Sequence, residues 1–440
     1  MAKWLVEGDD RLRAGLVLAV VAGLLCAPAM AASGAGLGGL LKKKQTQEAP
    51  PEKRPWMVAT QPPAMTVPVE PLGFYAPGPY YQGQRQSLVS LDFLDENRLL
   101  FTFRAPGLIH RTGDESEEER QIRAVVIDLP TGVVEHEAVW TLHDHARYLW
   151  MLKDGHFLLR DLNDLKQGDA SLELKPLLHF PGPLLWLEMD PEQQYLVTDS
   201  HEPIQTPEKT ESLVKQPEAA YSPPAAGQPE VVLRILRRAS GQVLLVSRVH
   251  NTVYLPINSA GYLETQAKND RQWRLNLSSF TGGTRSLATV DSTCDPRVDF
   301  ITDSELLVNA CNPDGTQRLV AWSSDGRRLW EAPTLVNEVW PLLVMSPAGP
   351  WMARETLFVT HPIDAYSPLS FDDVLGQVVD VYDAATGKVA LRAPASPVLD
   401  GGGNAAFSPS GKRLAVVNAG SIEVYDLTRA AKSGAPGRAH

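Results

Sequence analysis

Short apolar runs that are broken by a tight polar turn and then resume recur along most of this chain. The turns are rich in Asp, Asn, Ser, Pro and Gly, which stabilise hairpin turns through local hydrogen bonds or a positive φ. The flanking runs alternate apolar and polar residues or stay apolar, as half-buried and buried strands do. Each copy therefore predicts a β-hairpin. The seven copies occupy residues 91–103, 149–159, 187–198, 255–265, 298–310, 343–355 and 406–417.

A second hairpin follows most of these copies. Its clear examples lie at 124–134, 232–246, 319–330 and 378–391, and its weaker examples lie at 159–180 and 273–289. Two hairpins per repeat make a four-stranded antiparallel sheet, and the mean repeat spacing of about 50 residues is close to that of known propeller blades. The pattern therefore predicts an all-β fold, a seven-bladed β-propeller of four-stranded antiparallel blades over residues 66–430.

The last repeat lacks a fourth strand of its own, because it ends after SIEVYDLTR at 421–429. The segment TVPVEPLGFYAP at 66–77 precedes the first repeat and can supply the missing strand. We expect this N-terminal strand to close the ring by pairing the two ends of the propeller. Closure would also hide sheet edges that otherwise promote aggregation.

The final repeat resembles a known family. AFSPSGKRLAVV at 406–417, followed by SIEVYDLTR, is similar to the repeat of bacterial exported WD40-like and YVTN-like propellers. The shared pattern is apolar-Ser-Pro-x-Gly-x-x-apolar, then a strand that ends in Tyr/Trp-Asp. VDVYDAATGKV at 379–389 resembles the outer hairpin of the same family. The resemblance implies a propeller with an exported or scaffolding role, and it implies no particular reaction.

The N-terminus has the pattern of a secretory signal. Arg11 and Arg13 precede an apolar run at 14–25, and the Ala-Met-Ala segment that ends at Ala31 fits the small-x-small cleavage pattern. We expect residues 1–31 to be a signal peptide that is cut near Ala31. The alternative is a retained membrane anchor, although the apolar run is short for a helix that spans a bilayer.

Composition suggests how the remaining segments behave. Residues 32–65 are basic and Pro-rich, so we expect a disordered linker, and we expect a disordered tail at 431–440. The mature chain has no apolar run of about 18 residues, so we expect no transmembrane segment. The net charge of −11 argues against nucleic acid as the partner, because a phosphate binder needs a basic face. We expect an exported protein, located in the periplasm or the extracellular space.

Two cysteines remain once the signal peptide is removed. Cys294 and Cys311 form an even pair, which suits an oxidising compartment. They flank one predicted hairpin and should lie nearly opposite each other, so we expect them to form a disulfide. The alternative is two free buried thiols.

Three long insertions interrupt the repeats, at 107–121, at about 200–229 and at 362–377. Each falls between the second and third strands of its blade, so we expect all three on one face of the ring. Loops on a rigid scaffold are where function collects, although neutral surface expansion is the alternative.

Most histidines map to the predicted insertion-bearing face or its flanks. They are His110, His143, His145, His179, His201, His250 and His361. His143 and His145 are candidate metal ligands, because they flank Asp144 and imidazole is a common metal ligand. The alternative, that these are ordinary loop or core histidines, leads us to expect no metal site and no cofactor.

No motif for a particular reaction is present. The chain contains neither G-x-S-x-G nor H-E-x-x-H, and we identify no hydrolase domain after the propeller. We therefore expect no enzyme activity. The preferred hypothesis is a binding or scaffold propeller that presents its loop-rich face to a protein, peptide or polysaccharide partner in the cell envelope. The alternatives are a metal- or quinone-dependent enzyme with a site at the axial channel, and a structural subunit of an exported assembly.

Overall fold

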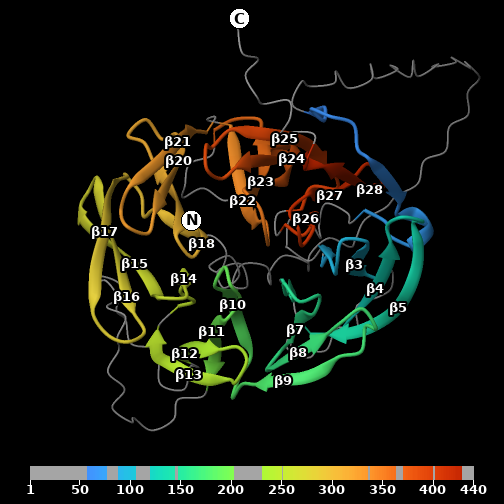
Figure 1. The fold of residues 1–440 in the computed structure, drawn as a ribbon, viewed down its shortest axis with the longest axis horizontal. Helices are drawn as coiled ribbons and strands as arrows, with labels where there is room; N and C mark the ends of the chain where they lie inside the picture. The colour runs from blue at the N-terminus through green and yellow to red at the C-terminus, as the bar shows by residue number, and fades with distance from the viewer. Residues whose placement is uncertain are drawn as a thin grey trace, which may run out of the picture.

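A computed structural model describes most of the chain from Met57 onwards. The described residues are 57–76, 88–105, 119–143, 147–202, 230–249, 251–334, 337–362, 370–399 and 402–428. The predicted signal peptide with its cleavage site near Ala31, most of the predicted linker, and the predicted tail lie outside these ranges. In the described part of the chain, seven four-stranded antiparallel sheets stand around a common axis (Figure 1). The predicted seven-bladed all-β propeller is confirmed.

The strands run in chain order from the axis outwards in blades 1 to 4. Blade 1 contains β2 (Ser90–Phe93), β3 (Arg98–Arg104), β4 (Arg120–Asp128) and β5 (Val133–Leu142). Blade 2 contains β6 (Leu149–Met151), β7 (Phe157–Asp161), β8 (Asp164–Gly168) and β9 (Lys175–His179). Blade 3 contains β10 (Leu184–Met189), β11 (Tyr195–Glu202), β12 (Glu230–Arg237) and β13 (Gln242–Val249). Blade 4 contains β14 (Ile257–Asn258), β15 (Gly261–Asn269), β16 (Gln272–Ser279) and β17 (Thr284–Asp291).

The remaining blades follow the same plan, and the last one borrows a strand. Blade 5 contains β18 (Arg297–Thr302), β19 (Glu305–Cys311), β20 (Gln317–Ser323) and β21 (Arg328–Pro333). Blade 6 contains β22 (Glu338–Met345), β23 (Trp351–Val359), β24 (Val374–Asp383) and β25 (Val389–Ala395). Blade 7 contains β26 (Ala405–Phe407), β27 (Arg413–Asn418), β28 (Ser421–Asp426) and β1 (Met65–Pro68). Two short 3₁₀ helices, η3 (Glu70–Leu72) and η6 (Phe371–Asp373), complete the described elements.

The blades are held together by apolar side chains that pack face to face. Seven buried clusters occupy the seven interfaces between neighbouring blades, including the one between blade 7 and blade 1. Both faces of the middle strands are therefore covered, which explains why β3 and β23 are buried along most of their length. This is why the sequence shows nearly continuous apolar runs as well as alternating ones.

The ring closes through the N-terminal strand, as predicted. β1 pairs antiparallel with β28, from Met65 opposite Val424 to Pro68 opposite Ser421. The contact extends upstream of residue 66, because Ala64 N donates to Val424 O at 2.7 Å and Thr60 N donates to Arg392 O at 2.9 Å. The last residues of the predicted linker therefore pack on blades 6 and 7, and the propeller's N-terminal boundary moves upstream.

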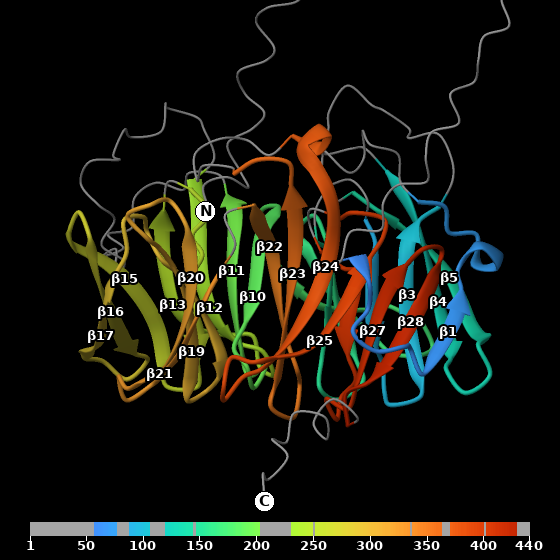
Figure 2. The same ribbon diagram turned by 90° about the horizontal axis from the view of Figure 1, so that it is seen from above.

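The three insertions leave and re-enter the ring on one face. The strands before them are β3, β11 and β23, and all three are the second strand of their blade. Their arrowheads point to the same edge of the ring in the side view (Figure 2). We call this edge, formed by the turns between second and third strands and by the links between blades, the insertion face. Among the described residues, no helix combines the length and apolar character needed to cross a bilayer.

Replacing Val67 with Asp should destabilise the fold by about 3 kcal/mol or more, because an unpaired charge would enter the blade 7–blade 1 core. Val67 is 4% exposed and belongs to that cluster. The measurement is the free energy of unfolding in urea. Thr66→Asp is the matched control, since Thr66 is exposed on the same strand, and it should change stability by less than about 0.5 kcal/mol. Equal effects of both substitutions would show that β1 does not seal the ring.

Candidate functional site

The innermost strands carry charged side chains on the side that faces the ring axis. Asp92 lies on β2, Glu188 on β10, and Arg297 and Asp299 on β18. Each is half-buried and has buried apolar neighbours in sequence that turn into the blade interfaces. Arg147 lies just before β6 on the link from blade 1, and it is exposed.

One guanidinium group ties this set together electrostatically. Burial raises the pKa of Asp92, Glu188 and Glu355, which belong to blades 1, 3 and 6, and in each case the positive charge of Arg147 opposes part of the rise. Asp92 and Glu188 lie on the innermost strands of their blades, so this opposing charge acts at the axial edge of the ring. Arg147 is held in place by its Nε, which donates to Leu149 O at 3.2 Å, and by the Trp150 ring, whose centroid lies 5.3 Å from the guanidinium carbon.

The carboxyl groups near the axis resist ionisation. Burial raises the pKa of Asp92 to about 6, against the opposing effects of a 2.6 Å hydrogen bond from Ser90 and the charge of Arg147. Burial raises the pKa of Glu188 to about 7, although Arg147 and Arg297 oppose the shift. Burial against the surrounding blades destabilises the ionised carboxylates more than the positive charges of Arg147 and Arg297 stabilise them.

A second charged group spans blades 3 to 5. Tyr254, on the link into blade 4, donates its hydroxyl hydrogen to Asp299 Oδ1. Arg297 Nε donates to Asp299 Oδ2 at 3.2 Å, and its guanidinium carbon lies 4.7 Å from the centroid of the Tyr254 ring. The Trp186 ring meets Tyr254 edge-on at 6.4 Å. Asp299 is therefore fixed by two partners.

Glu355 is the most unusual member of the site. It is the fifth residue of β23, it is 0% exposed, and neither carboxyl oxygen has a hydrogen-bond partner among the described residues. At the same position of the second strand in blades 1 and 3, a polar side chain holds the link into the next blade: Thr102 bonds the Tyr148 hydroxyl at 2.6 Å, and Asp199 Oδ2 accepts from Val253 N at 2.7 Å. Burial raises the pKa of Glu355 to about 8, so the group carries a proton at neutral pH.

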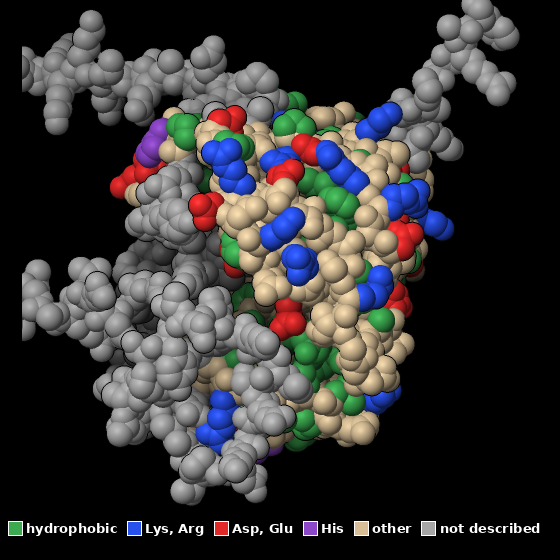
Figure 3. Space-filling view, turned by 90° about the vertical axis from the view of Figure 1, so that its left-hand side faces the viewer, with side chains coloured by type: hydrophobic (Ala, Val, Ile, Leu, Met, Phe, Trp, Pro, Cys, Tyr) green, Lys and Arg blue, Asp and Glu red, His purple; other side chains and the backbone are tan. Residues whose placement is uncertain are grey.

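We define the axial cluster as Asp92, Arg147, Glu188, Tyr254, Arg297, Asp299 and Glu355. None of these residues is among the candidate site residues predicted from the sequence. A signal for three of them was present, because an acidic residue sits between two apolar ones in the first strand of three repeats: Leu-Asp92-Phe, Leu-Glu188-Met and Val-Asp299-Phe. A strand buried on both faces would not carry an acid at that place. The outer wall differs, since Lys, Arg, Asp and Glu are interspersed there over the described surface (Figure 3).

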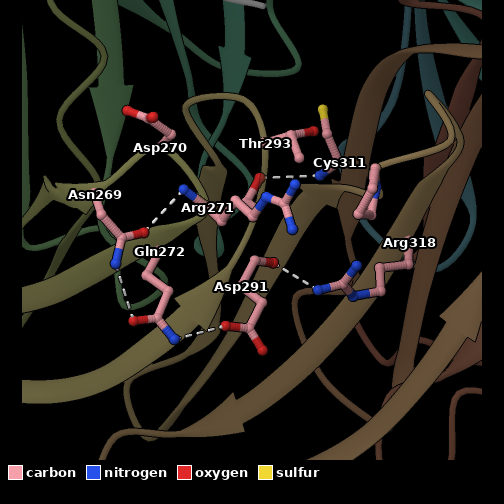
Figure 4. Close-up of a pocket in the computed structure, with 10 residues that line it drawn as sticks. Asn269, Asp270, Arg271, Gln272, Asp291, Thr293, Cys311 and Arg318 are labelled. Carbon is pink, nitrogen blue, oxygen red and sulfur yellow. Dashed lines mark hydrogen bonds between the residues drawn. The ribbon is translucent and has the colours of Figure 1, made fainter.

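A separate polar pocket of about 530 Å³ lies on the insertion face between blades 4 and 5 (Figure 4). Arg271 enters it from the β15–β16 turn. Arg318 Nη2 donates to the backbone oxygen of Asp291 at 2.5 Å, and Gln272 Nε2 donates to Asp291 Oδ1 at 3.0 Å. Several of its polar groups bond one another, and its lining contains both acidic and basic side chains.

The predicted disulfide is confirmed and borders this pocket. Cys294 and Cys311 are bridged, with their Cα atoms 5.6 Å apart. Ser292 Oγ accepts from Cys311 N at 3.0 Å and donates to Cys294 O at 2.7 Å, which ties the link between blades 4 and 5 to the end of β19. The bridge therefore stiffens the insertion face rather than the opposite one.

Of the two candidate metal ligands, only His143 lies within the described residues. His143 Nδ1 lies 3.0 Å from Asp161 Oδ1, and Lys166 Nζ contacts the other oxygen of that carboxylate at 2.9 Å. His145 lies outside the described residues. Within the described ranges, no group of three or more His, Cys, Asp or Glu residues is arranged to hold a metal ion. Metal binding by His143 and His145 is untested.

No known protein family and no curated protein matches this chain. Solved structures do match it. They include an acylaminoacyl peptidase from Pyrococcus horikoshii, at 10% identity and a TM-score of 0.44 over 79% of this chain and 53% of that chain. TolB from Acinetobacter baumannii matches at 12% identity and a TM-score of 0.37, over 75% of this chain and 78% of that chain. An uncharacterized protein from Listeria monocytogenes EGD-e matches at 7% identity and a TM-score of 0.45, over 79% of this chain and 93% of that chain.

These similarities show the propeller fold alone, and the WD40-like or YVTN-like family stays a prediction. The chain spans about half the length of the peptidase that it matches. One expectation is corrected, namely that the chain has no enzyme activity. That inference was wrong, because the matching structures include an enzyme, the acylaminoacyl peptidase.

Removing the disulfide with the double substitution Cys294→Ser and Cys311→Ser should lower the free energy of unfolding by about 3 kcal/mol, because the unfolded chain regains the freedom of the closed loop. The two cysteines are 17 positions apart. Urea unfolding measures the change. Dithiothreitol should bring the unsubstituted protein to the same stability and leave the variant unaffected. A variant as stable as the oxidised protein would contradict this account.

Substituting Glu355 with Gln should stabilise the protein at pH 8 by about 1–3 kcal/mol, because the carboxyl is ionised in the unfolded chain at that pH and folding must reprotonate it or bury its charge, whereas an amide requires neither. A folded-state pKa raised from 4.5 to about 8 means that the native protein holds an extra proton between these values. The contribution of Glu355 to stability is therefore present at low pH and is lost as the pH rises through about 8. Urea unfolding from pH 4 to pH 9 should show the advantage of the variant growing with pH. An advantage that does not vary with pH would contradict the assignment.

Proposed function

We propose that this chain is an exported binding propeller, in which the insertion face and the axial cluster form one recognition surface for a protein or peptide partner in the cell envelope. The observation that carries the proposal is the shared location of these parts. The three insertions leave the ring at the ends of β3, β11 and β23, and Arg147 lies on a link between blades, which belongs to the same face.

The rest of the fold suits a scaffold for such a surface. Seven interblade cores and the β1–β28 pairing hold the strand ends in place. Loops positioned by a rigid framework are the common sites of binding, since the framework has already lost its conformational freedom. On the opposite face, the described turns between strands are short; the link between β6 and β7, for example, covers only residues 152–156.

Two further observations support export and a protein partner. The Cys294–Cys311 bridge suits an oxidising compartment, as does the signal-like N-terminus. The polar pocket beside that bridge adds mixed-charge hydrogen-bonding groups to the insertion face. Polar, mixed-charge surfaces with a few aromatic anchors are typical of protein recognition, and the axial cluster adds Tyr254 and its neighbour Trp186 to them.

Pull-down from an envelope fraction tests the proposal. Residues 203–229 would be replaced by a short Gly-Ser link, which the fold should accept because Glu202 and Glu230 are directly paired. We expect the variant to lose at least tenfold in partner recovery. The control is Lys153→Ala with Glu192→Ala, an exposed ion pair of 3.0 Å on the opposite face, and it should recover the partner normally. If the loop-replaced variant recovered the partner as well as the unsubstituted protein, the proposal that the insertion face binds the partner would be wrong.

A further inference from the structure

We propose that the polar pocket between blades 4 and 5 binds the C-terminal carboxylate of a partner peptide or protein, and that Arg271 is the group that receives it. This inference rests on the proposed function, because it names the part of the partner that the insertion face would hold and the place where it would be held. It follows from the way the pocket is built, from the guanidinium group of Arg271, and from the balance of charge in the lining.

The pocket is built from segments of two blades that are tied to one another. They are the β15–β16 turn, the link from β17 to β18, and the β19–β20 turn, with the strand ends beside them. Ser292 N donates to Arg271 O at 2.8 Å, and Cys311 N donates to Ser292 Oγ at 3.0 Å. Thr293 N donates to Cys311 O at 3.1 Å, and the bridge to Cys294 adds a covalent tie. The walls are therefore fixed in advance, which reduces the conformational freedom that binding has to remove.

Arg271 offers an unpaired cation to the space between these walls. Figure 4 shows its side chain extending from the β15–β16 turn into the pocket. Its backbone is held on both sides, because its N–H donates to Asn269 Oδ1 at 2.9 Å and its carbonyl oxygen accepts from Ser292 N. Within the described residues, its guanidinium group makes no hydrogen bond and no ion pair. A planar fork of N–H donors in this state can bind a carboxylate through two parallel hydrogen bonds.

Arg318 supplies a second positive charge, and its orientation is already set. Its Nη2 donates to Asp291 O at 2.5 Å, and its Nη1 donates to Asn312 Oδ1. Its Nε lies 3.6 Å from Glu331 Oε1, while the other oxygen of Glu331 forms an ion pair with Arg328. Glu331 is therefore shared between two arginines. Arg318 adds positive potential to the pocket, and Arg271 has the donors that a ligand can use.

The acidic residues of the lining decide which kind of anion fits. Asp270 and Asp291 line the pocket together with the two arginines, so its basic side chains are matched by acidic ones. Among the described residues, neither the Asp270 carboxylate nor Asp291 Oδ2 accepts a hydrogen bond. A phosphate or sulfate group would be repelled by these carboxylates. The end of a peptide instead presents a carboxylate with an amide N–H beside it, and this combination matches the donors and acceptors of the pocket.

The size and position of the pocket favour a chain end over an internal segment. Its volume of about 530 Å³ lies within the range of sites for small ligands and suits the last few residues of a peptide. A chain end can enter a concavity between two blades directly, whereas an internal segment must turn back on itself inside it. Capture of a chain terminus is a recurring mode of peptide recognition. The contacts are to main-chain groups, so we expect binding to depend on the free carboxylate more than on the sequence.

Biolayer interferometry on the full mature chain tests the inference. The probes are a pool of short mixed-sequence peptides, immobilised through their N-termini and ending in a free carboxylate, and the same pool ending in an amide. We expect the free-carboxylate pool to bind at least tenfold more protein. Arg271→Gln should reduce this binding at least tenfold, and Arg271→Lys, which keeps the charge, should retain part of it. The control Arg274→Gln, an exposed arginine on β16 outside the pocket lining, should bind like the unsubstituted protein. A matched urea midpoint would show that each variant is folded.

The outcomes separate this inference from the proposed function. Equal binding of the two pools, or equal binding by Arg271→Gln and Arg274→Gln, overturns the carboxylate site even if the loop-replaced variant loses its envelope partner. Amidated peptides with an internal Glu that bind as well as the free-carboxylate pool would overturn the assignment to a chain end. Binding of the free-carboxylate pool by the loop-replaced variant would support the carboxylate site while leaving the insertion at 203–229 to be judged by the pull-down.

Discussion

The structure depends on the packing of each blade against its two neighbours. A four-stranded sheet cannot bury both faces by itself, and here every sheet does so only because another sheet stands on each side. The seven apolar clusters are thus a continuous belt rather than a central core. This series of clusters closes on itself because β1, from the start of the propeller, completes blade 7 and packs Val67 against blade 1.

This packing decides where polar chemistry can lie. Apolar contacts occupy both faces of the middle strands. Inside the ring, charged side chains therefore lie at the axial edge of the innermost strands or near the ends of the second strands. Thr102 and Asp199 use the second location to hold the next blade. Glu355 occupies the same place without such a contact, which makes blade 6 the exception among these three.

The electrostatics of the axis follow from the same geometry. Blades on all sides remove water from Asp92 and Glu188, while the cations that oppose this come from only two side chains, Arg147 and Arg297. Raised carboxyl pKa values in such a place are common at functional sites, because groups that titrate near neutral pH can respond to a ligand. The propeller fold supplies this buried environment, and the fold alone does not determine which chemistry takes place in it.

The sequence by itself determined the repeat, the number of blades, the closure by an N-terminal strand and the pairing of Cys294 with Cys311. These features follow from local patterns: hairpin turns between apolar runs are short-range, and a cysteine pair across one hairpin is brought together by the hairpin itself. Only the tertiary structure decided the axial cluster, because Asp92, Arg147, Glu188 and Glu355 are far apart along the chain and the closed ring arranges their blades around one axis. The sequence showed each acid as one polar residue within an apolar strand, and the loss of water around it depends on blades that are distant in sequence. The same limit applies to His143, whose partner Asp161 comes close only when blade 2 packs against blade 1.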